Sequence, residues 1–179
     1  MLANQVSQAI AIVNHGGVIA YSTETVLGLG CDPSNEDAVN RILWLKNRAV
    51  ENGLILLVAN IDAMQQHTHT LSETQNKRIA STMNTTWLAP PRAETPKWVV
   101  GKSKKVAVRI TTHTIALKLC ASIQGIISTS ANISGYKTLI NRQEIREWFG
   151  PHVDYVIIGK PGTGIPSKIK DLLSGETLR

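Results

Sequence analysis

The chain has 179 residues, 42% hydrophobic and 18% charged, which is enough for a substantial core and is not the composition of a disordered protein. Its 19 Lys and Arg exceed its 13 Asp and Glu, and the formal charge of +6 favours an anionic partner, although one Phe and three Tyr provide few side chains for stacking on RNA bases. No apolar run approaches the roughly 20 residues of a membrane span and no signal peptide pattern begins the chain, so we expect one cytoplasmic domain without membrane contact.

The first thirty residues predict a helix followed by two strands. Hydrophobic residues recur at helical spacing over residues 6–13, and Gly16 with Gly17 allows the positive φ that ends a helix. Residues 18–21 and 26–31 are apolar runs of strand length, separated by the polar turn 22–25. We therefore expect a polar loop between two neighbouring strands.

A second helix and a central strand are predicted next. Ser34 and Asp37 resemble a capping box, and apolar residues then continue at helical spacing toward Lys46. Residues 54–59 form a continuous apolar run, which is typical of a central strand covered on both faces. The polar segment 61–83 is predicted to be helical.

The rest of the chain alternates strands with helices. Further strands are predicted at 85–88, 106–110, 126–129 and 153–158. Helices are predicted at 113–123 and 142–149, the second with Asn141 as N-cap and Gly150 at its end. Such alternation indicates a single α/β domain over residues 1–179, with a twisted mixed parallel and antiparallel sheet and flanking helices.

The Cys and His residues do not predict a metal site. Cys31 and Cys120 lie far apart without C-x-x-C spacing, so we expect buried thiols. His67 and His69 have no third ligand nearby in the sequence and are expected to face solvent.

Four polar clusters follow or interrupt apolar elements, where a rigid scaffold can hold their side chains toward a shared cleft. They are S-T-E-T at 22–25, K-N-R at 46–48, S-T-S-A-N at 128–132 and P-S-K-I-K-D at 166–171. Taken singly, each has an ordinary structural interpretation, because hydroxyl groups cap turns and a basic helix end complements the helix dipole.

Six segments occur in order along residues 4–179: G-G-V-I-A-Y-S-T-E-T-V-L-G-L-G-C-D, L-K-N-R, G-L-I-L-L-V, V-A-V-R-I, S-T-S-A-N-I-S-G and P-S-K-I-K-D. In this order they resemble the YrdC/TsaC family of threonylcarbamoyl-AMP synthases. The resemblance implies a YrdC-like fold and an L-threonylcarbamoyladenylate synthase, a nucleotidyltransferase. Such an enzyme would make threonylcarbamoyl-AMP from L-threonine, bicarbonate or CO2 and ATP, release pyrophosphate, and serve the N6-threonylcarbamoyladenosine modification of tRNA.

The same resemblance implies the residues of the site. The catalytic residues would be those of its K-x-R and S-x-N signatures, namely Lys46, Arg48, Ser130 and Asn132. ATP would be held by Arg48, Asn52, Lys105, Asn132 and Arg179. Threonine would be held by Thr25, Arg109, Ser130 and Ser167. These residue types suit the chemistry, because cationic groups neutralise phosphoryl oxygens and an arginine fork pairs with a carboxylate.

The implied reaction has the threonine amine take up CO2 as a carbamate, whose oxygen attacks the α-phosphorus of ATP and expels pyrophosphate. An anionic carbamate needs no strong general base, so positioning and charge neutralisation become the main requirements. Mg²⁺ is expected to bridge the phosphates. The implied partners are a downstream threonylcarbamoyl transferase and weakly bound tRNA or other RNA, and the protein is expected to be a monomer.

The chain departs from the family pattern at several positions. Leu57 stands where many relatives have His, and residues 81–84 replace the usual W-P-G-P. Ser22 replaces a common Pro, and the segment 137–141 differs from a Pro-rich loop that would contact ATP. We carry over no site residue from that last segment.

Two other functions compete with the synthase. The +6 charge and a sheet-rich fold are also compatible with a non-catalytic RNA-binding module that uses a basic concave face. The fold also occurs as a carbamoyl-transfer module within larger maturation enzymes. Short length and the lack of zinc-ligand clusters favour the stand-alone synthase.

Overall fold

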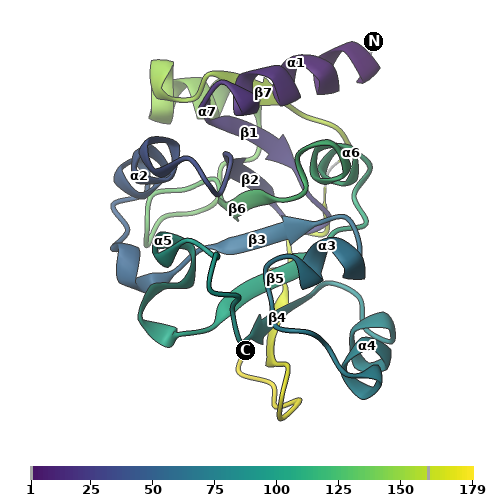
Figure 1. Ribbon diagram of the computed structural model, residues 1–179. Coiled ribbons are helices and arrows are strands. Elements are labelled where there is room, and N and C mark those ends of the chain that lie inside the picture. The colour runs from purple at the N-terminus through teal and green to yellow at the C-terminus, as the bar shows by residue number, and fades with distance from the viewer. Residues whose placement is uncertain (1, 161) are drawn as a thin grey trace.

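The computed structural model describes residues 2–160 and 162–179, and its strands form one mixed sheet (Figure 1). The strands are β1 (Ile19–Ser22), β2 (Leu27–Gly30), β3 (Ile55–Val58), β4 (Thr85–Ala89), β5 (Val106–Ile110), β6 (Ile126–Ser130), β7 (Tyr155–Ile157) and β8 (Lys168–Asp171). Their order is β7-β1-β2-β6-β3-β5-β4-β8, which runs from β7 near the top of Figure 1 to β4 near the bottom. β1 with β7, β3 with β5 and β4 with β8 are parallel, and the other neighbours are antiparallel.

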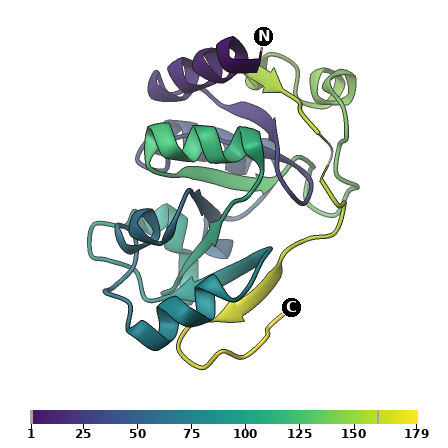
Figure 2. The same cartoon turned by 90° about the vertical axis from the view of Figure 1, so that its right-hand side faces the viewer.

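Helices cover both faces of this sheet. They are α1 (Leu2–Asn14), α2 (Glu36–Leu45), α3 (Ile61–Gln65), α4 (Glu73–Ala80), α5 (Lys97–Val100), α6 (Thr114–Ile123) and α7 (Arg142–Phe149), with short 3₁₀ turns η1 (Val50–Asn52), η2 (Gly101–Ser103) and η3 (Gly150–His152). α1 and α6 pack together over one face, as Figure 2 shows, and α2, α3, α4, α5 and α7 contribute to the core on the other. Within the described ranges, no helix is both long enough and apolar enough to cross a membrane.

The alternation of side chains along β3 explains why this strand is central. Leu56 and Val58 are fully buried in the larger core, together with Trp87 of β4. Leu57 points to the opposite face and is fully buried in the smaller core beneath α1 and α6. Each such side chain contributes about 1.5–3 kcal/mol on burial, and the predicted central position of 54–59 is confirmed.

The start of α2 corrects the predicted capping box. Asn35 is the N-cap, because its side-chain oxygen accepts a hydrogen bond of 2.9 Å from Ala38 N. The Ser34 hydroxyl instead donates to Asp32 Oδ1 at 2.7 Å, and the Ser34 amide uses the same carboxylate. The predicted capping box of Ser34 and Asp37 was wrong, because the Ser34 side chain is hydrogen bonded to Asp32 and does not cap the helix.

The helical segment predicted over 61–83 is confirmed only in part, because it contains two separate helices, α3 and α4, with a non-helical stretch between them. Thr68 interrupts it by forming an isolated β-bridge with Pro91. Ser72 then starts α4 with a capping box, in which its side chain accepts from Gln75 N and the Gln75 side chain accepts from Ser72 N. The other predicted strands and helices are confirmed to within a few residues.

One row of residues crosses four strands on the face that carries α1 and α6. Ser128 of β6 lies opposite Ile55 of β3, Ile55 opposite Ala107 of β5, and Ala107 opposite Leu88 of β4. All four residues line a cavity. The cavity therefore lies over the part of this face that α1 and α6 leave uncovered, and the sheet forms its floor.

Candidate active site

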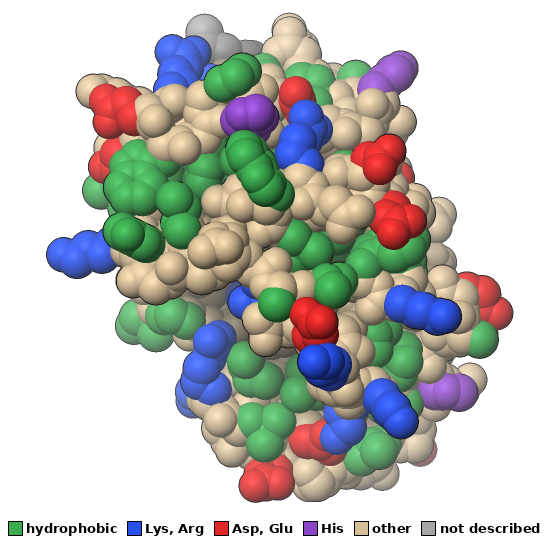
Figure 3. All heavy atoms as spheres, turned by 90° about the vertical axis from the view of Figure 1, so that its left-hand side faces the viewer, with side chains coloured by type: hydrophobic (Ala, Val, Ile, Leu, Met, Phe, Trp, Pro, Cys, Tyr) green, Lys and Arg blue, Asp and Glu red, His purple; other side chains and the backbone are tan. Residues whose placement is uncertain are grey.

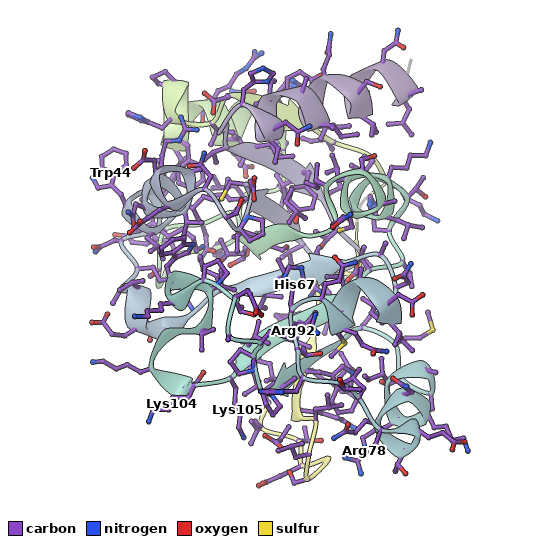
Figure 4. All side chains as sticks on the ribbon, in the orientation of Figure 1. Trp44, His67, Arg78, Arg92, Lys104 and Lys105 are labelled. Atoms are coloured by element: carbon purple, nitrogen blue, oxygen red, sulfur yellow. The ribbon has the colours of Figure 1, made fainter. Side chains whose placement is uncertain are left out.

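A cavity of about 430 Å³ lies over this sheet floor. It is also lined by residues of the turn between β1 and β2, the turns η1 and η2, and the segments around β6, β8 and the C-terminus. Figure 3 views the molecule from the side of α2 and α5, where Lys and Arg side chains gather on the lower half of the surface. In Figure 4, Lys105 lies below α5, near the point that Figure 1 marks as the C-terminus.

The lining of the cavity carries basic side chains. Four of its lining residues are basic, and none of its described lining residues is acidic. Two are paired from outside the lining, Lys105 with Asp171 and Arg109 with Glu24, and the other two are Arg48 and Arg179. Such an arrangement raises the local concentration of an anionic ligand.

The turn η1 holds Arg48 at the cavity wall. Arg48 Nη2 donates hydrogen bonds of 3.1 Å to Asn52 O and 3.0 Å to Gly53 O, so its guanidinium lies over this turn. Partial burial lowers the pKa of the Arg48 guanidinium from its usual value. Because Gly101 has no side chain, η2 can pack directly against η1. A Cβ at its φ of +67° would lie 2.5 Å from Glu51 O and Gly53 N.

Lys46 lies behind the cavity wall and holds the strand end that carries Ser130. Its ammonium donates to Ser130 O, to Asn132 O at 2.8 Å and to Asn132 Oδ1 at 3.1 Å, which uses all three N–H groups. The residue is only 3% exposed. Burial, followed by the nearby charge of Arg48, lowers the pKa of Lys46 to about 8.

Asn132 is likewise engaged within the protein. Its Oδ1 accepts a hydrogen bond of 2.5 Å from Ser130 Oγ in addition to the one from Lys46. Its Nδ2 donates to Ile133 O at 2.9 Å and to Tyr136 O at 2.8 Å. The amide therefore ties the segment 133–136 to the end of β6.

Hydroxyl groups converge near Arg109. Thr25 Oγ1 lies 3.0 Å from Thr23 Oγ1, which itself donates to Val26 O at 2.7 Å and shapes the turn. Ser167 Oγ lies 2.8 Å from Thr86 Oγ1. Thr25 and Ser167 are buried and line the cavity together with Arg109, so this part of the site offers several neutral donors beside one cation.

The structure brings the predicted site residues together. Eight of the ten line the cavity: Thr25, Arg48, Asn52, Lys105, Arg109, Ser130, Ser167 and Arg179. The remaining two, Lys46 and Asn132, are not part of the lining and contact Ser130 from behind. Leu57, which replaces the histidine of many relatives, also lies outside the lining.

Several lining residues were not predicted. Thr23 and Ser128 belong to polar clusters that the sequence did identify, so their hydroxyl groups were available as a signal. Ser103 and Thr138 lie in segments without such a signal, and Thr138 falls in the loop where the family pattern is lost. The apolar part of the wall includes Leu54, Val99, Val100 and Ile169.

The described side chains include no cluster of three His, Cys, Asp or Glu residues that would hold a metal ion. Cys31 and Cys120 are buried free thiols, as predicted, and burial raises the pKa of Cys120 to about 12. His67 is partly buried rather than solvent-facing, and burial lowers its pKa.

An α/β fold with a cationic, hydroxyl-lined cavity over one face of its sheet has the architecture that suits a small anionic ligand. A family model described as Telomere recombination, which names Sua5, YciO and YrdC, matches residues 11–179. The chain belongs to the Sua5/YciO/YrdC family.

Relatives of known name or structure match most of the chain. The threonylcarbamoyl-AMP synthase of Cellvibrio japonicus (strain Ueda107) is 41% identical over 179 residues, covering 98% of this chain and 95% of that protein. The crystal structure of P. abyssi Sua5 complexed with L-threonine is 29% identical with a TM-score of 0.83, covers 93% of this chain, and is matched over 50% of its own length. E. coli YciO shares the fold, with a TM-score of 0.86 at 24% identity, covering 98% of this chain and 88% of that chain.

Proposed function

We propose that the chain is a threonylcarbamoyl-AMP synthase that uses L-threonine, bicarbonate or CO2, and ATP, and that serves the threonylcarbamoyladenosine modification of tRNA. The observation that carries this proposal is the convergence of eight predicted site residues, from distant segments, on one cavity. The named relative with 41% identity over nearly the full length of both chains supports the same activity. The cavity volume of about 430 Å³ lies within the range of small-molecule sites.

The two substrates are assigned to different parts of the cavity. The walls around η1 and α5 combine Arg48 and Asn52 with the apolar Val99 and Val100, a combination that suits a nucleotide. Lys105 and Arg179 add positive charge for its phosphates. The part near Arg109 has hydroxyl groups and one guanidinium, which suit the hydroxyl group and the carboxylate of threonine.

In the proposed reaction, the threonine nitrogen bonds to the carbon of CO2 and loses a proton, which gives a carbamate. A carbamate oxygen then bonds to the α-phosphorus, the bond from that phosphorus to the bridging oxygen breaks, and pyrophosphate leaves. Arg48 neutralises charge on the phosphoryl oxygens, and the hydroxyl groups and Arg109 hold threonine in place. Mg²⁺ is expected to arrive with the ATP phosphates, because the described residues provide no acidic cage for it.

Lys46 and Asn132 act through Ser130 in this proposal. The ammonium of Lys46 is committed to Ser130 and Asn132, and the amide of Asn132 is fully hydrogen bonded. Their contribution is therefore to fix the end of β6 where it meets the nucleotide, rather than to contact phosphate directly. Ser130 carries the contact from this segment to the cavity.

Threonine-dependent release of pyrophosphate tests the proposed function. The purified protein is incubated with ATP, Mg²⁺ and bicarbonate, with L-threonine or L-serine in parallel, and pyrophosphate is measured. We expect release to require bicarbonate and to be faster with threonine. Pyrophosphate release at the same rate with or without an amino acid would count against the synthase. The absence of release, together with RNA binding that weakens steeply with salt, would favour the RNA-binding module instead.

The product is expected to pass to a separate transferase that moves the threonylcarbamoyl group to tRNA adenosine. The protein is expected to act as a monomer, with only weak RNA contact of its own. Size-exclusion chromatography with light scattering tests the first expectation, and RNA titration at physiological salt tests the second.

A further inference from the structure

Glu24 forms a buried ion pair with Arg109, the guanidinium assigned above to the threonine carboxylate. Arg109 Nε lies 3.0 Å from Glu24 Oε1, and the two side chains are only 5% and 10% exposed. The N–H and the oxygen are not aligned as a hydrogen bond, so the attraction is mainly between the two charges. Thr111 Oγ1 donates a hydrogen bond of 2.7 Å to the other carboxylate oxygen, Glu24 Oε2.

The backbone around Glu24 is held from the other side by the segment 162–164. Thr163 N donates to Glu24 O at 3.0 Å, and Gly164 N donates to Thr25 O at 2.8 Å. Gly162 packs so closely that a Cβ there would lie 2.4 Å from Thr25 O. The turn 22–25 is therefore fixed, and the carboxylate of Glu24 is held in a defined position.

Arg109 lines the cavity, whereas Glu24 does not. The Nε atom of the guanidinium lies beside Glu24, and no described residue accepts a hydrogen bond from the terminal nitrogens. A guanidinium is planar, so an ion pair that holds Nε in place also restricts the direction of its terminal N–H groups. Those groups form the fork that a substrate carboxylate needs for a bidentate contact.

We propose that Glu24 is a positioning residue for recognition of the amino-acid carboxylate. Glu24 orients Arg109, and Thr111 orients Glu24, so that the terminal nitrogens of Arg109 face the substrate. Glu24 balances the buried charge of Arg109 without occupying the cavity. This inference rests on the proposed function, because it requires an amino acid with a free carboxylate as the ligand.

Binding of L-threonine and of L-threoninamide, which lacks the carboxylate, tests the proposal by titration calorimetry. Glu24→Gln should weaken L-threonine binding by about tenfold or more and leave the affinities for L-threoninamide and ATP nearly unchanged. The ratio of L-threonine affinity to L-threoninamide affinity should therefore fall. Thr111→Val, which keeps the ion pair, should lower the same ratio by a smaller factor. Glu24→Asp should recover part of it.

The control is Glu73→Gln, an exposed acid on α4 that forms an ion pair with Lys77. It should leave all three affinities unchanged. Equal loss of L-threonine and L-threoninamide binding in Glu24→Gln and Thr111→Val would mean a merely structural ion pair and would overturn the proposal. If the wild-type protein bound L-threonine no more tightly than L-threoninamide, the assignment of Arg109 to the carboxylate would also be wrong. This outcome is seen in the wild type alone, so it is distinguishable from equal losses in the variants. If Glu24→Gln does not fold, the ratio of L-threonine to L-threoninamide affinity in Thr111→Val tests the proposal by itself.

Discussion

Lys46 and Asn132 are joined by two hydrogen bonds, because the Lys46 ammonium contacts both the backbone oxygen of Asn132 at 2.8 Å and its side-chain oxygen at 3.1 Å. A third N–H goes to Ser130 O, so one buried cation organises the whole end of β6. The consequence is that Lys46 determines the geometry of the site without lining it.

Replacing Lys46 with methionine should lower kcat by about 100-fold or more, because the carbonyl groups of Ser130 and Asn132 lose their donor and the strand end shifts. Each unsatisfied buried carbonyl costs about 1–3 kcal/mol, which removal of the buried charge partly offsets. Single-turnover kinetics and thermal unfolding measure the two effects. A variant with normal kcat would remove the organising role of Lys46.

The pH dependence of the rate should show the titration of Lys46. Its pKa is lowered to about 8, so the ammonium carries three donors below pH 8 and loses one as the pH rises through that value. We expect kcat to fall by about tenfold between its plateau and pH 9. Lys46→Arg is the comparison, because arginine does not deprotonate and the threonine amine and bicarbonate titrate equally with both proteins. If the decrease persists unchanged in Lys46→Arg, another group is responsible.

Arg48→Ala should remove charge neutralisation at the phosphoryl group while the fold persists. We expect kcat/KM for ATP to fall by about 100-fold or more, with a change of no more than about 1 kcal/mol in the free energy of unfolding. Arg146→Ala on the exposed face of α7 is the matched control and should change neither quantity. Steady-state kinetics with varied ATP and chemical denaturation check these values.

Gly101→Ala should separate η1 from η2 and weaken ATP binding. The added Cβ would lie 2.5 Å from Glu51 O and Gly53 N, and a φ of +67° strains any L side chain. Gly135→Ala is the control, since its φ is +87° but nothing lies within 4 Å of an added Cβ. Gly135→Ala should lose about 1 kcal/mol of stability from φ strain, Gly101→Ala should lose more because of the added contacts, and only Gly101→Ala should raise KM for ATP severalfold. Equal KM values would show that the contact between the two turns does not shape the nucleotide site.

Asp171→Asn should reduce stability at neutral pH and change its acid dependence. The Lys105 ammonium and hydrogen bonds from Ser174 lower the pKa of Asp171 from 3.8 to about 2, so the ionised carboxylate stabilises the folded state above pH 4. That contribution disappears as the pH falls from about 4 to about 2. The difference in free energy of unfolding between wild type and variant, measured with urea, should shrink over this interval. A constant difference would mean that the ion pair does not contribute.

Most strands could be predicted because their signal is local. The run 54–59 is continuously apolar, and only a strand covered on both faces requires that pattern. The start of α2 could not be predicted correctly, because Ser34, Asn35 and Asp32 all carry capping groups and their competition depends on three-dimensional geometry. The break between α3 and α4 depends on the bridge from Thr68 to Pro91, a contact between segments more than twenty residues apart.

The site shows the same division. The residue types and their order pointed to one cavity, and the structure brings eight of ten together. Sequence could not indicate that the Lys46 ammonium turns inward to Asn132 rather than toward a phosphate, because a residue at a helix end is free to point either way. Nor could it pair Glu24 with Arg109, which come together only when β5 lies beside the turn 22–25.

The row formed by Ser128, Ile55, Ala107 and Leu88 links binding to folding. Its members come from four strands and become neighbours only after β6, β3, β5 and β4 have all paired. A partly assembled sheet therefore lacks the floor of the binding cavity. Ligands that recognise this surface bind the native chain alone and must raise its melting temperature by mass action. Loss of any one central strand would therefore abolish recognition altogether instead of reducing it by degrees.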